Sequence, residues 1–216
     1  ILSKRKMFEQ IIGYLRAHRG DSGIIYVLSR GSAEKLADKL TAQGFAAKPY
    51  HAGLTNEKRN KHQESFVRDQ CRIMVATIAF GMGINKSTVR FVIHADLPKN
   101  IESYYQETGR AGRDGLPSDA ILYFSGGDVI KLKKFALVED NPGQTRVMLN
   151  KLSQMAALAE TNSCRRRSIL NYFGEESPDE CANCDICLTT KEKFDATVIA
   201  QKALSAVARL DSRYGL

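Results

Sequence analysis

Several features that define other protein classes are missing from this 216-residue sequence. Apolar runs such as residues 24–28 have the length of a strand, far short of the roughly 20 residues that a membrane-spanning helix needs. Glycine and proline number only 16 and 5, which excludes a collagen-like or low-complexity chain. There is neither a signal peptide nor an initiator methionine before Ile1, and we expect the sequence to be a piece of a longer protein.

Positive charge is in excess, although it is not concentrated in runs. The chain has 32 Lys and Arg against 24 Asp and Glu, a formal net charge of +8. Such an excess favours a phosphate-rich partner such as nucleic acid. A basic, solvated surface without any such partner explains the same numbers equally well, so charge alone does not decide between the two.

Four of the five cysteines lie within 24 residues, in the pattern C-x₁₆-C-x₂-C-x₂-C formed by Cys164, Cys181, Cys184 and Cys187. Tight clustering without a signal peptide favours a metal site in a reducing compartment over a secreted disulfide framework. Four thiolates complete a tetrahedral structural zinc site. An iron–sulfur cluster is the alternative, but a second cysteine set and a Cys-Pro pair are missing, which favours zinc. We expect the isolated Cys71 to be a small core residue.

Strand-like and helix-like segments alternate through the first 128 residues, which predicts an α/β fold with a parallel sheet and helices on both faces. The expected strands are residues 24–28, 46–50, 72–76, 89–94 and 120–124; the expected helices are 4–18, 32–44 with Ser32 as its cap, 55–67 and one after Asn100. From Gly127 onward only helical patterns remain, at residues 129–138, 147–159, 165–172 and 196–210, with an acidic, cysteine-rich loop at 175–187.

Four predicted loops follow the carboxyl ends of these strands, where open parallel sheets bind ligands. They are residues 29–31, 51–55, 77–83 and 95–100, and they are rich in hydroxyl groups and small residues. Their backbone N–H groups and the helices that they begin are suited to phosphate. The same residue types are ordinary turn and cap residues, so phosphate binding is a hypothesis at this point.

The most informative stretch is QETGRAGRDG, residues 106–115. If it is helical, Gln106, Arg110 and Arg113 share one face, whereas Gly109 and Gly112 would each destabilise that helix by about 1 kcal/mol. The glycines therefore predict a close approach of a backbone or a ligand. Two guanidinium groups on one face suit a polyanion, and an arginine at a γ-phosphate accelerates phosphoryl transfer about a thousandfold or more. A solvated basic helix face is the alternative.

These segments resemble the motifs of superfamily 2 helicases and, in detail, those of the RecQ family of DNA helicases. QETGRAGRDG resembles motif VI; VATIAFGMGINK at 75–86 resembles motif V, IIYVLSR at 24–30 motif IV, and YHAGL at 50–54 the segment between them. The similarity runs from about residue 20 to 190. DEAD-box RNA helicases usually carry His at the position of Gln106, which favours the RecQ family. The cysteine spacing is similar to that of the RecQ zinc-binding subdomain.

The resemblance implies a role for each motif. Arg113 would be the arginine finger that reaches ATP bound in a partner domain, assisted by Arg110 and Gln106. The single-strand track would run along Ser29, Arg30, His51 and Thr77. The loop that relays the state of the nucleotide to DNA would contain Gly81, Gly83 and Asn85.

The resemblance also implies a domain organisation and partners. Residues 1–128 would be the second RecA-like domain, 129–192 a helical zinc-binding subdomain, and 193–216 the start of a winged-helix region. The full protein would be an ATP-dependent 3′-to-5′ DNA helicase of DNA repair and recombination, located in the cytoplasm, at the nucleoid of a bacterium or in the nucleus of a eukaryote. Its partners would be single-stranded DNA, forks or duplex junctions, and a preceding RecA-like domain, but no membrane.

Two other functions are compatible with the sequence. The first is a zinc-stabilised nucleic-acid-binding module that has the fold without motor activity. The second is an RNA helicase, which a comparison of stimulation by DNA and by RNA separates from a DNA helicase.

The sequence has no G-x-x-x-x-G-K-[ST] phosphate loop, no Gly-Lys pair and no Asp-Glu-x-His motif for Mg²⁺. Family members carry both motifs in a preceding motor domain, which would bind most of the ATP and Mg²⁺. We therefore expect the 216-residue chain by itself neither to hydrolyse ATP nor to unwind DNA. ATP turnover by the purified chain, with and without single-stranded DNA, checks this expectation, and DNA-stimulated hydrolysis would contradict it.

Overall fold

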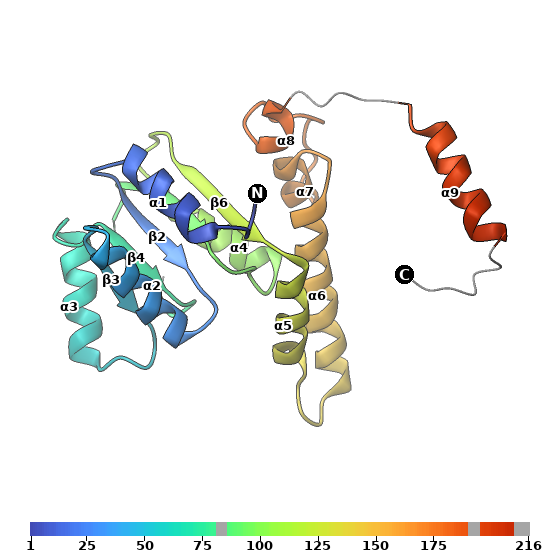
Figure 1. Ribbon diagram of the computed structural model, residues 1–216. Coiled ribbons are helices and arrows are strands. Elements are labelled where there is room, and N and C mark those ends of the chain that lie inside the picture. The colour runs from blue at the N-terminus through green and yellow to red at the C-terminus, as the bar shows by residue number, and fades with distance from the viewer. Residues whose placement is uncertain (81–85, 190–194, 210–216) are drawn as a thin grey trace.

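A parallel sheet with helices on both faces forms the first part of the chain (Figure 1). The computed structural model describes residues 1–80, 86–189 and 195–209. In these ranges six strands pair in the order β1-β6-β5-β2-β4-β3, and every neighbouring pair is parallel. The predicted fold class is therefore confirmed.

The elements follow the predicted alternation closely. The first part contains β1 (Leu2–Ser3), α1 (Met7–Ala17), β2 (Ser22–Tyr26), α2 (Arg30–Ala42), β3 (Ala47–Tyr50), α3 (Asn56–Val67), β4 (Ile73–Ala76), β5 (Val89–His94), α4 (Ile101–Thr108) and β6 (Asp119–Phe124). The second part contains α5 (Gly126–Ala136), α6 (Pro142–Glu160), α7 (Arg165–Tyr172), α8 (Asp185–Leu188) and α9 (Thr197–Arg209). Two short elements were not expected: β1, whose two residues are too few to show a periodic pattern, and α8, which lies at the end of the segment predicted as a loop.

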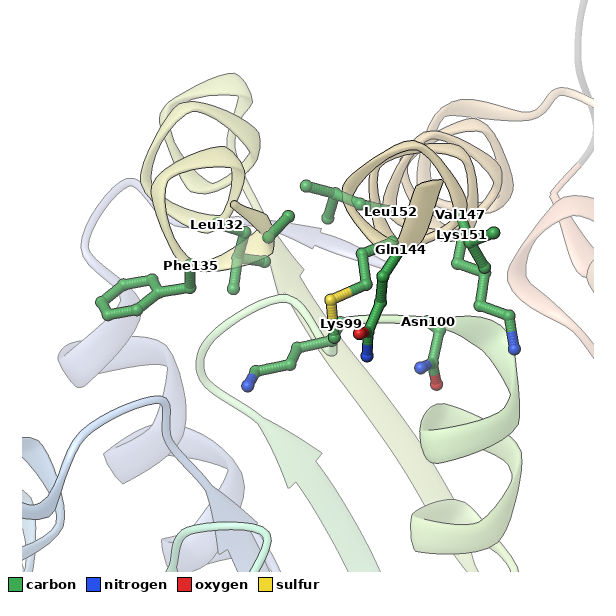
Figure 2. A pocket seen from close by; sticks show the side chains of 10 residues that line it. Lys99, Asn100, Leu132, Phe135, Gln144, Val147, Lys151 and Leu152 are labelled. Carbon is green, nitrogen blue, oxygen red and sulfur yellow. The ribbon is translucent and has the colours of Figure 1, made fainter. Parts of the chain in front are cut away.

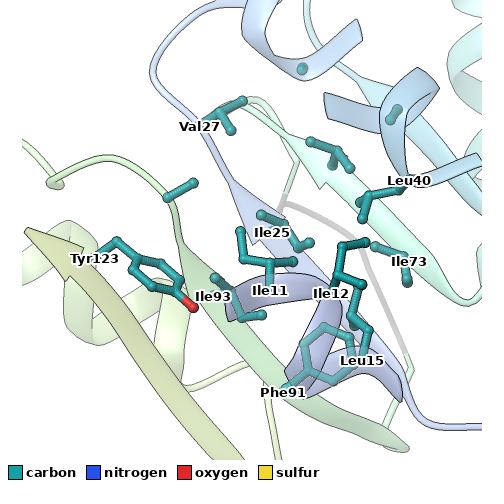
Figure 3. Close-up of a cluster of buried hydrophobic side chains, with 14 residues drawn as sticks. Ile11, Ile12, Leu15, Ile25, Val27, Leu40, Ile73, Phe91, Ile93 and Tyr123 are labelled. Atoms are coloured by element: carbon teal, nitrogen blue, oxygen red, sulfur yellow. The ribbon is translucent and has the colours of Figure 1, made fainter. Parts of the chain in front are cut away.

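The central strands are apolar on both faces, as strands buried in a parallel sheet have to be. On one face, Ile25 and Ile93 pack against Ile11, Ile12 and other apolar side chains of α1 and α2 (Figure 3). On the other face, the next residues along the same strands pack against α3 and α4. Alternate residues of a strand point to opposite faces, so each central strand contributes side chains to an apolar core on either face of the sheet.

Side-chain caps set where the helices begin at the carboxyl edge of the sheet. The Ser29 Oγ accepts a hydrogen bond from the backbone N–H of Ser32 at 3.1 Å, so α2 begins earlier than expected and the prediction of Ser32 as its cap is wrong. The Asn100 Oδ1 likewise accepts the N–H of Ser103 at 2.8 Å at the start of α4. Both caps lie in predicted ligand-binding loops, so these loops are fixed by their own helices.

The second part is helical, as expected, and α5 and α6 lie side by side as a hairpin next to α4 and β6 (Figure 1). Leu132 of α5 and Leu152 of α6 share an apolar cluster with Leu122 of β6. The described residues of α9 include no buried side chain, and α9 stands apart from the rest of the structure in Figure 1. Among the described residues, every helix is too short or too polar to cross a bilayer.

Two glycines give opposite predictions for the same substitution. A Cβ on Gly23 in β2 would lie 2.1 Å from the buried ring of Phe91, whereas a Cβ on Gly13 in α1 would meet no atom within 4 Å. We expect Gly23→Ala to lower the free energy of unfolding by about 1–3 kcal/mol through overpacking. Gly13→Ala should raise it by about 0.5–1 kcal/mol, because alanine favours a helix interior over glycine.

Urea denaturation of the two variants and the unsubstituted chain measures both effects. Equal stability of the two variants would contradict the packing of Gly23 against Phe91.

Candidate nucleic-acid interface and four-cysteine site

A cavity of about 240 Å³ opens at the carboxyl ends of β2, β4 and β5. It is lined by Ser29 and Thr77, two of the residues expected on the single-strand track, together with Asp96 and Lys99. The chain thus brings Ser29 and Thr77 to one opening, although 47 positions separate them in the sequence. Thr77 is half-buried, and its N–H donates to the carbonyl oxygen of Tyr50 at 3.1 Å.

Arg30 lies beside this opening, on the first turn of α2. Its side chain packs across Gly53, where a Cβ would lie 3.0 Å from the Arg30 Cδ and 3.2 Å from His51 Nδ1. A larger residue at position 53 would have to displace Arg30. The glycine therefore holds the exposed arginine close to the turn that follows β3.

His51 is placed differently from the other expected track residues, because its side chain is only 3% exposed. Its Nε2 lies 3.2 Å from Glu34 Oε1, which joins α2 to the turn after β3. Its contact with phosphate stays a prediction, and its burial favours a positioning role behind Arg30. The remaining expected residues, Gly81, Gly83 and Asn85, lie outside the described residues.

A buried polar pair joins the end of β5 to α4. His94 Nε2 lies 2.7 Å from Glu107 Oε2, and their side chains are only 1% and 8% exposed. The other ring nitrogen of His94 has no hydrogen-bond partner within the described part of the chain, so the contact with Glu107 is the hydrogen bond that orients this ring. The pair fixes the helix that carries Gln106 against the sheet.

Tyr26 of β2 extends this buried pair toward the arginine segment. Its ring stacks on that of His94 with 5.3 Å between centroids, and its hydroxyl donates to the carbonyl oxygen of Phe80 at 3.0 Å. Burial raises the pKa of Tyr26, and a hydrogen bond and the positive charge of Arg110 oppose that rise. Tyr26 thus stays neutral and contacts both the end of VATIAF and the arginine segment.

The arginine segment does not continue the helix. α4 ends at Thr108 with Gly109 as its C-cap, and Gly112 has φ +67°, so the expected helical spacing of Gln106, Arg110 and Arg113 is wrong. A Cβ on Gly112 would lie 2.6 Å from Ser118 Oγ, and the N–H of Gly112 donates to the carbonyl oxygen of Val89 at 2.9 Å. The close approach that the glycines predicted is confirmed, and the chain itself makes it.

The three polar side chains of this segment differ in exposure. Gln106 and Arg113 are exposed, while Arg110 is half-buried beside Tyr26. The Arg113 Nε donates to the carbonyl oxygen of Gly109 at 3.4 Å. The turn anchored at Gly112 therefore presents Arg113 on the surface from a fixed backbone.

The four clustered cysteines come together as expected. Their Sγ atoms all lie within 4.8 Å of one another, with Cys184 3.5 Å from Cys187 and 4.0 Å from Cys164. A metal ion with four sulfur ligands at about 2.3 Å sets those sulfurs about 3.8 Å apart. The geometry and the donor set therefore fit a tetrahedral zinc ion.

Backbone N–H groups around the cluster prepare it for thiolates. The N–H of Cys184 donates to the Cys181 Sγ at 3.3 Å, and that of Cys181 to the Cys187 Sγ at 3.4 Å. Partial burial raises the pKa of Cys184, but backbone N–H donors outweigh it and lower the pKa to about 6. Since the thiolate is the form that binds metal, these N–H groups favour metal binding by Cys184. At Cys187 the N–H of Cys181 lowers the pKa, but burial and the neighbouring cysteines outweigh it and raise the pKa to about 12.

Ion pairs attach the cysteine loop to the helices. The Arg165 guanidinium donates two hydrogen bonds, of 2.7 and 2.9 Å, to the carboxylate of Asp185. It also donates to the carbonyl oxygen of Leu158 at 2.7 Å. Arg167 pairs with Asp179 in the acidic loop. Arg165 thus connects α7 both to α8 and to the last turns of α6, in addition to the four-cysteine site.

Comparison with known families divides the chain at the end of the sheet. Residues 3–115 match the family "Helicase conserved C-terminal domain", and residues 126–188 match "RecQ zinc-binding". The second match contains all four clustered cysteines. Together with the sulfur geometry, it supports structural zinc as the metal of this site.

Removal of one ligand should release the zinc. We expect Cys184→Ser to abolish stoichiometric zinc binding and to loosen residues 175–188, because three thiolates leave the tetrahedral site open. Cys71→Ala is the matched control, since Cys71 is buried in the sheet core far from the cluster in sequence and should retain zinc. Zinc content by elemental analysis measures both, and zinc retained at full occupancy in Cys184→Ser would contradict the four-cysteine site.

Known proteins support the same assignment along the whole chain. The ATP-dependent DNA helicase RecQ of Pasteurella multocida is 46% identical over 100% of this chain and 34% of its own length. The RecQ-like DNA helicase BLM of Xenopus laevis is 42% identical over 87% of this chain and 15% of its own length. A solved DEAD box protein from Methanococcus jannaschii, 27% identical, superposes with a TM-score of 0.54 over 68% of this chain and 38% of its own.

The chain thus spans about a third of the RecQ relative that it matches from end to end. Its sheet has the fold of the helicase domain, and its helices hold a cysteine cluster that fits zinc. Both regions match their families separately and in the same order. The chain therefore belongs to the helicase conserved C-terminal domain family, in the form that continues into a RecQ zinc-binding region.

Proposed function

We propose that this chain is the second motor domain and zinc-binding subdomain of an ATP-dependent 3′-to-5′ DNA helicase. The observation that carries the proposal is the buried position of Tyr26, which contacts Phe80 of motif V and Arg110 of motif VI. β2 ends at Tyr26, and Ser29 follows three residues later at the opening of the carboxyl-edge cavity. A short segment of chain thus connects an expected DNA contact with an expected nucleotide contact.

Arg113 is the arginine finger in this proposal. Its exposure, on a turn that Gly112 anchors to β5, supports contact with a nucleotide held by another domain. Its guanidinium would stabilise the charge of the transferring phosphoryl group. Arg110 and Gln106 assist from the same segment, and a preceding RecA-like domain supplies the phosphate loop, most of the ATP site and Mg²⁺.

The single-strand track runs along the carboxyl edge of the sheet. The side chains of Ser29, Arg30 and Thr77 contact phosphates there. The buried His51 does not reach the strand in this proposal but positions Arg30. The N-terminus of α2 lies at this edge, and helix N-termini favour anions through their N–H groups and dipole. Because phosphate contacts carry no sequence information, this track suits a motor that moves along any sequence.

ATP binding would close the two motor domains around Arg113 while both hold one strand. The segment with Gly81, Gly83 and Asn85 would relay the state of the nucleotide to the track. In sequence this segment begins directly after Phe80, whose carbonyl oxygen accepts a hydrogen bond from the Tyr26 hydroxyl. Alternating closure and release would then move the enzyme 3′ to 5′.

The domain limits belong to the same proposal. Residues 1–128 form the motor domain, 129–192 the zinc-binding subdomain, and 193–216 begin a winged-helix region. The partners are single-stranded DNA and forks or duplex junctions, at the nucleoid of a bacterium or in the nucleus of a eukaryote. The two rivals are a zinc-stabilised binding module without motor activity and an RNA helicase.

Substitution of Arg113 in the full-length protein separates motor from binding module. We expect Arg113→Ala to lower DNA-stimulated ATP hydrolysis about a thousandfold while single-strand binding stays close to that of the unsubstituted protein. Arg68→Ala is the control, because Arg68 is also exposed and, among the salt bridges of the described residues, pairs with Glu64 of the helix that it caps. Full ATPase activity in Arg113→Ala would refute the arginine finger.

The unsubstituted protein tests the rivals in the same assay. Absence of any nucleic-acid-stimulated ATP hydrolysis would favour the binding module. Stimulation by RNA but not by DNA would favour the RNA helicase.

A further inference from the structure

A second cavity adjoins the carboxyl-edge cavity and shares two residues with it. This cavity, of about 230 Å³, lies between the start of α4 and the α5–α6 hairpin, and its apolar lining includes Leu132, Val147 and Leu152 (Figure 2). Lys99 and Phe135 line both cavities. The surface that contains Ser29 and Thr77 is therefore continuous with the surface of α5.

Phe135 is the most exposed aromatic side chain at this junction. It lies in the last turn of α5 and is 63% exposed. Figure 2 shows its ring directed away from α6, on the same side as the Lys99 side chain. An exposed phenylalanine adds little to the core that Leu132 of the same helix makes, so a role in packing does not account for it.

The charge around Phe135 is positive. Lys99, Lys131, Lys133 and Lys134 are exposed, and within the described ranges no salt bridge involves any of them. The nearby acid Asp128 is buried and bound to Lys4, and Glu102 pairs with Lys151. Asp128 and Glu102 are thus paired with lysines, and the two exposed acids that follow α5, Glu139 and Asp140, leave the four exposed lysines in excess.

An exposed aromatic ring beside lysines is the chemistry that binds single-stranded nucleic acid. Bases of any sequence stack on the ring, and ammonium groups hold the phosphates. We propose that Phe135 and Lys99 form a nucleotide subsite that extends the single-strand track from the edge of the sheet onto α5. This inference rests on the proposed function, because the track that it extends is part of that proposal.

An acidic peptide is the other ligand that such a surface could take. Continuity with Ser29 and Thr77 favours nucleic acid, because Lys99 and Phe135 line the same cavity as these two residues. A peptide would instead be expected to fill the apolar groove lined by Leu132, Val147 and Leu152.

Fluorescence anisotropy of labelled oligothymidylates with the full-length protein tests the subsite. We expect Phe135→Ala to weaken the binding of a long oligonucleotide roughly 5- to 100-fold, the loss of one stacked base. Phe135→Trp keeps an aromatic ring and should bind as tightly as the unsubstituted protein. Ile130→Ala, at an equally exposed position on the same helix (66%), should have no effect on binding.

Lys99→Glu gives a second measurement that does not depend on the aromatic ring. It should weaken binding of the long oligonucleotide and reduce the salt dependence of its affinity by about one phosphate contact. Melting temperatures of all variants identify any that are unfolded. If Phe135→Ala proves unstable, Phe135→Trp and Lys99→Glu decide the question between them.

Several results would overturn the subsite. They are unchanged affinity in Phe135→Ala, equal weakening in Phe135→Ala and Phe135→Trp at unchanged stability, and loss of an acidic peptide ligand without any loss of DNA. DNA-stimulated ATP hydrolysis by the unsubstituted protein reports on the proposed function separately. If that activity is present and Phe135→Ala binds normally, only the subsite fails.

Discussion

The buried contact of Tyr26, His94 and Glu107 is the constraint on which the arrangement of the motifs depends. These side chains lie in a core that is otherwise apolar, where a polar group without a partner costs about 1–3 kcal/mol. The imidazole and the carboxylate can satisfy each other only if α4 sits at one position against β5. The Tyr26 hydroxyl can reach the carbonyl oxygen of Phe80 only if the chain that follows β4 also lies at one position against β2. The cost of breaking these contacts therefore fixes the geometry of three motifs that are distant in sequence.

The sequence predicted the elements whose signal is local or periodic. The apolar strands, the helices that begin near Thr55 and Asn100 and the cysteine cluster could all be identified, because spacing along the chain carries that information. The end of α4 could not, because it depends on a hydrogen bond from Gly112 to Val89, 23 positions earlier. The burial of His51 and the position of Phe135 between two cavities depend in the same way on contacts between elements, which no single segment records.

The zinc-binding region shows what the metal contributes when apolar residues are few. The α5–α6 hairpin is held by a cluster of leucines and methionine that continues from the sheet, so this hairpin needs no metal. α7 and α8 contain no buried residue, although Cys164 at the start of α7 is buried. Ile169 and Tyr172 of α7 are only partly buried against that cluster, so the position of α7 and α8 depends further on the four thiolates and on the ion pair between Arg165 and Asp185. A bound metal ion contributes folding free energy to such a segment.

The positions of the charged side chains bear on a question that composition left open, namely whether the excess of positive charge serves a phosphate-rich partner. Many of the acids at the carboxyl edge and beside α5 are engaged by neighbouring cations: Asp96 and Asp128 both bind Lys4. Arg30 and Lys99 have no such partner among the salt bridges of the described residues. Lys4 alone faces both carboxylates and offsets only part of their charge, whereas Arg30 and Lys99 are exposed at the same edge. These exposed cations lie where a strand would bind, and charges that close to a phosphate are little screened by salt.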